Sequence, residues 1–169
     1  MKIMYRPYLF LLSVLGLTVL TVPACQSDEE EGPGGRERVT TLVITFTDGD
    51  GQTILFLGSD PDGVGGNDPA TDDIRLEAGT DYVISLSFLD ESGAEPKIIT
   101  GKIREEAEKH LVCYETTGDL PVPVLQDTDA NGAPLGLAAT LSTGNAGAGT
   151  LRITLKYEPA KDVADPCTT

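Results

Sequence analysis

The chain has 169 residues, with 12 Lys+Arg against 27 Asp+Glu, which gives a formal net charge of −15 at pH 7. This acidic balance argues against a nucleic-acid-binding protein, because such a protein needs a basic surface that displaces counterions from phosphate. Hydrophobic residues make up 40% of the chain, so it has enough apolar side chains to build a core. The length suits a single domain of ordinary size.

Residues 1–24 combine a basic start with an apolar run that ends just before a cysteine. Lys2 and Arg6 precede an almost wholly apolar run over residues 8–22, and Cys25 follows a proline and an alanine. A basic start, an apolar run of about 15 residues and a small residue before the cut are typical of a secretory signal, whereas a transmembrane helix needs about 20 apolar residues. The position of Cys25 resembles a lipobox, in which the thiol is acylated. We therefore expect Cys25 to carry lipid; the alternative is an ordinary signal peptide that contains a cysteine.

Residues 25–37 are expected to be the lipidated cysteine and a flexible acidic linker. The stretch from Gln26 to Gly35 contains no apolar residue, so it lacks the surface that would offset the entropy of ordering it. Its acidic cluster, Asp28–Glu31, resembles the signal that exports lipoproteins of Bacteroidota to the outer face of the outer membrane. A surface-exposed anchor and a periplasm-facing anchor both stay open.

Alternation of apolar and polar residues with a period of two dominates residues 38–169 and predicts an all-β domain. Turn residues divide this region into seven or eight short strands, which indicates an antiparallel, Ig-like β-sandwich. The strands with one wet face are expected at 42–46, 82–89 and 151–157. The run Gln52–Leu57 is nearly all apolar, which predicts a central strand covered on both sides. The shorter candidates are Ile74–Leu76, Leu111–Tyr114, Val122–Gln126 and Leu137–Leu141.

Two segments depart from this pattern. Ile98–His110 is rich in helix formers, which predicts a short helix that caps one end of the sandwich; a charged edge strand is the alternative. Gly144–Gly149 is rich in glycine but has no following Lys-Ser/Thr and helix, so it is expected to be a flexible hairpin loop and not a phosphate loop.

Cys113 and Cys167 remain once Cys25 is assigned to lipid, and an oxidising compartment favours a disulfide between them. Such a bond closes a loop of about 54 residues and contributes roughly 4 kcal/mol by chain entropy. The alternative, a redox or metal-binding pair, lacks a CxxC spacing.

Acidic loops are the leading candidates for chemistry, because clustered carboxylates repel one another unless a cation lies between them. Asp127, Asp129 and Asn131 match the first half of a calcium loop, although Ala138 stands where an EF-hand places its bidentate Glu. The same residues also suit an ordinary hairpin turn. A second calcium candidate, with a plain solvated loop as its alternative, consists of Asp60, Asp62, Asn67, Asp68, Asp72 and Asp73.

His110 is the only histidine of the chain. With Glu105, Glu106 and Glu108 it is a candidate ligand for zinc or copper. The alternative is a solvated or helix-capping side chain. No GxSxG motif or other nucleophile context accompanies His110, so the sequence does not predict an enzyme.

Five segments within residues 38–158 carry a resemblance to a known group: Val39-Thr40-Thr41, Asp60–Gly63 with Gly66-Asn67, Phe88–Ser92, Glu105–His110 and Asp127–Gly132. They resemble small, uncharacterised outer-membrane lipoproteins of Bacteroidota that are often labelled "type 1 periplasmic binding fold". A two-lobed protein of that type needs about twice this length and many βαβ units, so we take the location from the resemblance and not the fold. Members of the family continue with another acidic strand, which implies either that this chain lacks a last strand or that the sequence is truncated.

These features predict a lipid-anchored, non-enzymatic binding module of the outer membrane or cell surface, which binds through its loops. The resemblance implies an accessory role beside an outer-membrane nutrient receptor. The alternative function is a structural or adhesive surface domain stabilised by Ca²⁺, the leading cofactor candidate in this sequence.

Overall fold

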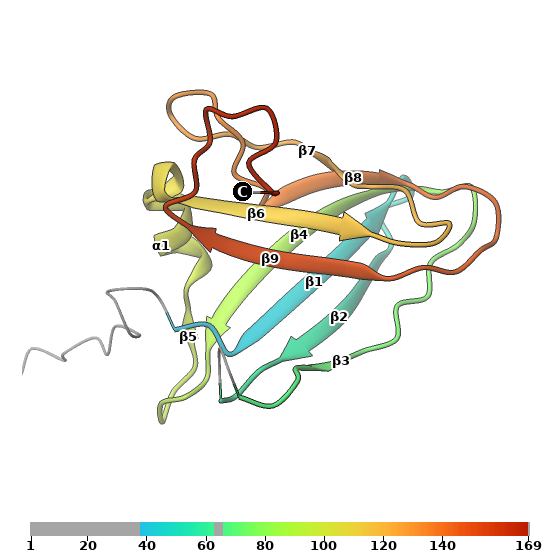
Figure 1. Ribbon diagram of the computed structural model, residues 1–169. Helices are drawn as coiled ribbons and strands as arrows, with labels where there is room; N and C mark the ends of the chain where they lie inside the picture. Colours follow the sequence, from blue (N-terminus) through green and yellow to red (C-terminus); the bar gives the residue numbers. More distant parts are fainter. Residues whose placement is uncertain (1–37, 63–65, 169) are drawn as a thin grey trace, which may run out of the picture.

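Three of the five long strands form where apolar and polar side chains alternate in the sequence. The computed structural model describes residues 38–62 and 66–168 (Figure 1). Its strands are β1 (Thr41–Asp48), β2 (Thr53–Ser59), β3 (Ala70–Thr71), β4 (Asp81–Asp90), β5 (Lys97–Ile98), β6 (His110–Thr116), β7 (Val124–Leu125), β8 (Ala138–Ser142) and β9 (Leu151–Tyr157). A short helix, α1 (Thr100–Glu105), and a 3-10 turn, η1 (Ala107–Lys109), precede β6.

The strands form two unequal antiparallel layers. Seven strands make the large sheet in the order β3-β2-β1-β4-β8-β7, with β5 paired to the end of β4, and β6 pairs with β9 in a two-stranded sheet. The two-stranded sheet lies across one face of the large sheet (Figure 1). The predicted all-β sandwich with one short helix is therefore confirmed. The seven-to-two division differs from the more even division of immunoglobulin domains.

The core lies between the layers. β1 pairs with both β2 and β4, so Phe46 aligns with Ile54 on one side and Ile84 on the other. Phe46 is fully buried and meets Phe56 and Tyr82 edge to face, with ring centroids 5.8 and 5.9 Å apart. Aromatic pairs prefer this arrangement because the positive edge of one ring faces the negative face of the other.

β6 closes the core from the other layer through Val112 and Tyr114. The hydroxyl of Tyr114 donates to the carbonyl of Gly136 at 2.9 Å, and burial raises the pKa of Tyr114 well above its ordinary value. Gly136 has a φ of +86°, and a Cβ at this position would lie 2.4 Å from the carbonyl oxygen of Val112. Only glycine allows the chain to pass so close to β6 in this conformation.

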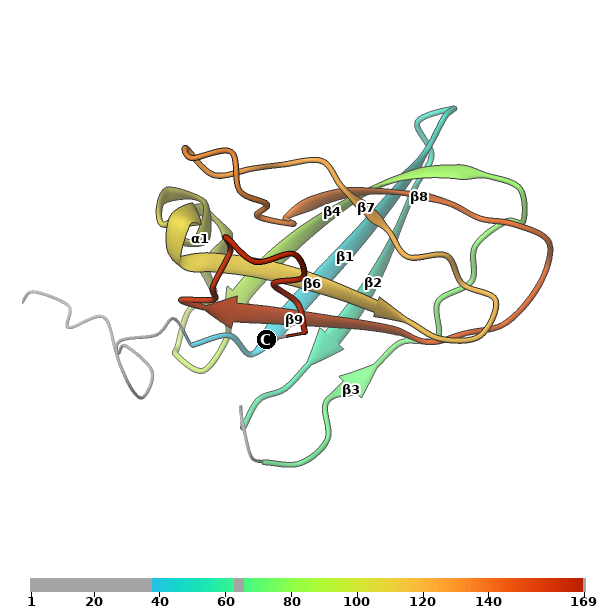
Figure 2. The ribbon, with the colours of Figure 1, turned by 45° about the horizontal axis from the view of Figure 1, so that its top comes forward.

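The chain after β9 folds back over the outer face of the two-stranded sheet (Figure 2). The predicted disulfide between Cys113 and Cys167 is present and ties this segment to β6. The ammonium of Lys156 on β9 donates to the carbonyl of Cys167 at 2.6 Å. The outward-facing side chains Leu111 and Cys113 are buried under this cover, with exposed fractions of 0% and 2%.

Two strand predictions were wrong in detail. The apolar run in β2 is not a central strand covered on both sides: β2 lies next to the two-residue β3 near the sheet edge, and Leu55 and Leu57 are 60% and 52% exposed on its outer face. Ile74–Leu76 is not a strand but a partly buried segment between β3 and β4.

The helix prediction is confirmed, because α1 and η1 occupy most of Ile98–His110 and the edge-strand alternative is wrong for that segment. The glycine-rich loop does not close a hairpin, since β8 belongs to the large sheet and β9 to the small one. None of the helices in the described residues is long and apolar enough to cross a bilayer.

Candidate functional site: a groove between the two sheets

The unequal division of strands leaves one side of the sandwich open. β6 lies over β4 and β8, whereas β9 lies on the side of β6 that is nearer β2 and β3 (Figures 1 and 2). No further strand of the small sheet continues beyond β9 in the described part of the chain. A groove of about 1470 Å³ runs between β9 and the inner face of β1 and β2 and continues along the loops at residues 119–121 and 143–150.

Apolar side chains line the inner part of the groove, because period-two alternation points one face of each bordering strand inward. The large sheet contributes Leu42 and the nearly buried Ile44 and Phe56, which are 8% and 9% exposed, and the small sheet contributes Leu151, Ile153, Leu155 and Tyr157. The three aliphatic side chains of β9 are only partly buried. Ile74 and Leu76, which the sequence suggested for a strand, line the groove instead.

The charged side chains that line the groove are mainly acidic. They are Asp60, Asp72, Asp73, Glu77 and Asp119, against Arg75 and Arg152. Arg152 also lies 3.8 Å from the carboxylate of Glu115 on β6. Together with the formal charge of −15, this lining gives the groove a negative field that attracts cationic ligands.

One edge of β9 faces away from β6. The N–H of Glu158 donates to the carbonyl of Lys109, and the N–H of Thr117 donates to the carbonyl of Thr150. These two bonds show which residue pairs of the antiparallel β6–β9 ladder are hydrogen-bonded and which are not. The residues of β9 that exchange hydrogen bonds with β6 are therefore Arg152, Thr154 and Lys156, and the backbone groups of the alternate residues point to the other edge. Within residues 38–62 and 66–168, the outward N–H and C=O groups of Leu151, Ile153 and Leu155 have no hydrogen-bond partner.

His110 lines the inner part of the groove but is not solvated, because only 1% of it is exposed. Its Nδ1 lies 3.0 Å from the carbonyl oxygen of Glu106, at the end of α1, and its ring meets that of Tyr157 edge to face at 5.4 Å. This is the helix-capping alternative, and the solvated alternative is wrong. In the described part of the chain, no three His, Cys, Asp or Glu residues form a group suited to a metal ion.

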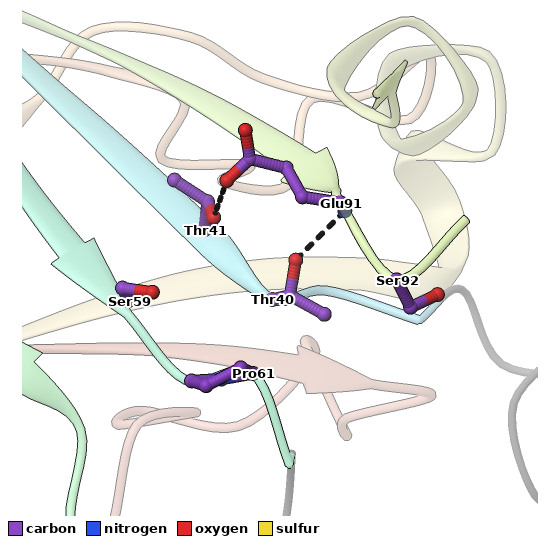
Figure 3. A pocket seen from close by; sticks show the side chains of 6 residues that line it. All are labelled: Thr40, Thr41, Ser59, Pro61, Glu91 and Ser92. Carbon is purple, nitrogen blue, oxygen red and sulfur yellow. Dashed lines mark hydrogen bonds between the residues drawn. The ribbon is translucent and has the colours of Figure 1, made fainter. Parts of the chain in front are cut away.

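A second pocket lies where β1, β2 and the end of β4 meet (Figure 3). Its volume is about 70 Å³, and it is lined by Thr40, Thr41, Ser59, Pro61, Glu91 and Ser92. The hydroxyl of Thr41 donates to the carboxylate of Glu91, whose own N–H donates to the hydroxyl of Thr40 at 2.8 Å. Ligand pockets usually measure about 300–1,000 Å³, so this polar pocket is too small to be the main site.

The calcium candidates at Asp127, Asp129 and Asn131 lie in one turn, but hydrogen bonds within the protein occupy the carboxylates. Asp127 accepts the N–H groups of Gly136 and Leu137 at 2.8 and 3.0 Å. Asp129 accepts the N–H of Asn131 at 3.0 Å and the ammonium of Lys161 at 3.0 Å. These contacts give the two aspartates a structural role in shaping the turn before β8.

The second acidic candidate is spread along the connection around β3. Asp62 accepts the backbone N–H of Asn67 at 3.0 Å and its side-chain amide at 2.6 Å, and these bonds lower the pKa of Asp62. Asp72 instead accepts the N–H of Leu57 at 2.9 Å and holds β3 to β2. Asp60, Asp68 and Asp73 join no metal-binding group in the described residues. Calcium binding by either loop stays a prediction.

Comparison with protein-family models, curated proteins and solved structures returned no match for this chain. The predicted lipidation site, Cys25, lies outside the described residues.

Proposed function

We propose that this protein is a lipid-anchored binding module of the outer membrane or cell surface and that it acts by binding in the groove beside β9, without a catalytic step. The observation that carries the proposal is the groove itself, with its volume of about 1470 Å³ and the apolar rows of side chains on its two facing sheets. This volume exceeds the range of about 300–1,000 Å³ that is typical of small-molecule pockets, which favours an extended ligand or a segment of another protein.

The anchor part of the proposal rests on the signal-like residues 1–24 and on the position of Cys25. Each buried CH₂ of an acyl chain contributes about 0.8 kcal/mol to membrane binding, so several chains on Cys25 hold the protein at the bilayer. Intact-mass measurement of the protein from a membrane fraction tests this part. We expect the mass of the chain from Cys25 onward plus acyl groups, and an unmodified chain that still carries residues 1–24 contradicts the anchor.

Site-specific photocrosslinking tests the binding site and the accessory role at a nutrient receptor. A photoreactive residue at Leu76, which lines the groove, is compared with one at Val83, which is 55% exposed on the outer face of the large sheet. We expect crosslinks to an outer-membrane receptor from position 76 and none from position 83. Equal labelling from both positions, or no labelling from position 76, contradicts the groove as the binding site.

The calcium-stabilised adhesive alternative is less favoured by the geometry. The carboxylates of Asp127 and Asp129 already accept hydrogen bonds from the protein. A binding role draws directly on the groove, whereas a purely structural role gives no reason for an open, apolar side of the sandwich.

A further inference from the structure

We propose that the occupant of the groove is an extended peptide segment of a partner protein, which adds as a strand to the free edge of β9 and carries basic residues at its ends. This inference rests on the proposed function and names the chemistry of the ligand.

The free edge of β9 supplies the backbone half of the interaction. Leu151, Ile153 and Leu155 direct three N–H and three C=O groups away from β6. An unpaired row of this kind is a template for another strand, and the main-chain hydrogen bonds give such complexes much of their affinity. A strand of about 5–6 residues is a usual length and matches this edge.

The apolar walls supply the side-chain half of the interaction. A strand added to β9 lies about 4.7–4.9 Å from it, in the direction of β2 and β3, and its side chains alternate between the two faces of the small sheet. The inward row of β9 consists of Leu151, Ile153 and Leu155. The side chains of the added strand that point inward lie beside this row of β9 and face the inner side of β2. There Phe56 lines the groove and Ile54 is 36% exposed. This arrangement favours a segment in which apolar residues alternate with polar ones.

The charge of the groove favours a basic partner segment over two other occupants, the chain's own acidic linker and a second copy of the chain. The five acidic residues that line the groove outnumber its two arginines, so basic flanks are favoured. The chain's own residues 26–35 contain the acidic cluster Asp28–Glu31 and no apolar residue, which fits neither the walls nor the charge. A second copy of the chain brings the same acidic surface and the same formal charge of −15, which repels the first.

The test uses the full chain in a mild nonionic detergent and the synthetic peptide KKVTVTVKK, with EEVTVTVEE as its charge-reversed control. Amide hydrogen exchange is followed by NMR at single residues. We expect the basic peptide to slow exchange at Leu151, Ile153 and Leu155 by roughly tenfold or more and to leave Arg152 and Thr154, which already bond to β6, unchanged. The acidic peptide is expected to have no effect.

Methylation of the peptide backbone makes the test independent of protein variants that fail to fold. Successive N–H groups of a strand point to opposite edges, so N-methyl groups on the three valines and on the two threonines block different edges. We expect N-methylation at one of these two groups of residues to abolish binding of the peptide, and N-methylation at the other group to leave its binding unchanged. Equal effects of both sets, equal binding of both peptides, or uniform protection along β9 contradicts strand addition.

Two further outcomes overturn strand addition of a partner segment. Alternating protection of β9 that appears without peptide and grows with protein concentration assigns the edge to a second copy and overturns the proposal. Receptor crosslinks from position 76 without any effect of KKVTVTVKK on β9 leave the binding groove in place and overturn strand addition alone.

Discussion

The ammonium of Lys161 lies 3.0 Å from Oδ2 of Asp129, and the two side chains are only 8% and 2% exposed. The same ammonium donates to the carbonyl of Ala107 in η1 at 2.7 Å. One buried ion pair therefore joins the segment after β9, the turn before β8 and the turn before β6. Removal of one partner leaves the other charge buried and uncompensated, which is strongly destabilising.

We expect Lys161→Met to lower the melting temperature by several degrees, measured by circular dichroism. Lys109→Met is the matched control, because Lys109 forms an ion pair with Glu106 at 3.3 Å in which the side chains are 49% and 33% exposed. Exposed pairs contribute little to stability, so this control is expected to melt close to the unchanged protein. Equal melting temperatures for the two variants would contradict a structural role for Lys161.

Acid should destabilise the fold partly through Asp129. Burial alone raises the pKa of this carboxyl, but the hydrogen bonds from Lys161, Ala133 and Asn131 outweigh it and hold the pKa below the ordinary 3.8. A carboxyl with a lowered pKa in the folded state adds stability above its unfolded pKa, and this stability is lost as the pH falls through the folded pKa. Urea unfolding from pH 7 to below pH 3.8 is expected to show a shallower loss for Asp129→Asn, and parallel curves would refute this contribution.

The disulfide between Cys113 and Cys167 spans 54 residues of sequence. The variant with both Cys113→Ser and Cys167→Ser is expected to lose about 4 kcal/mol of unfolding free energy, since the closed loop restricts the unfolded chain. Denaturant titration with and without a reducing agent provides the measurement. If the reduced and oxidised proteins unfold at the same denaturant concentration, the bond does not stabilise the domain.

Alanine substitutions at two glycines with positive φ distinguish the cost of backbone strain from the cost of a steric clash. Gly79 has a φ of +66° and nothing within 4 Å of an added Cβ, whereas Gly136 has a φ of +86° and the carbonyl of Val112 at 2.4 Å. Gly79→Ala is expected to cost about 1–2 kcal/mol through its backbone conformation. Gly136→Ala is expected to lower the free energy of unfolding by more than Gly79→Ala does, because the chain must also move away from β6. Similar costs in denaturant titration would argue against this close contact.

Much of the fold follows from local patterns in the sequence. The alternation in β1, β4 and β9 and the helix formers before β6 are local features, and the structure confirms what they predict. β3 and β5 have two residues each, which is too short for a period-two pattern. The apolar run in β2 predicted burial on both faces, but its position near the sheet edge leaves Leu55 and Leu57 exposed.

The groove could not be predicted because it depends on how the strands pair. The alternation in β9 shows that Leu151, Ile153 and Leu155 share a face, but not that the partner of β9 is β6 and that its other edge lacks one in the described chain. The sequence suggested the acidic residues as calcium ligands. The structure instead places three of them in the lining of the groove, where no common metal-binding group forms among the described residues: Asp60, Asp72 and Asp73.

Residue-level hydrogen exchange of the free protein is the decisive measurement for the proposed groove, because an open groove requires an open β9 edge. We expect fast exchange at the amides of Leu151, Ile153 and Leu155 and slow exchange at those of Arg152, Thr154 and Lys156, which bond to β6. Equal, strong protection of all six amides would show that the edge is already covered and would contradict the groove as a binding site.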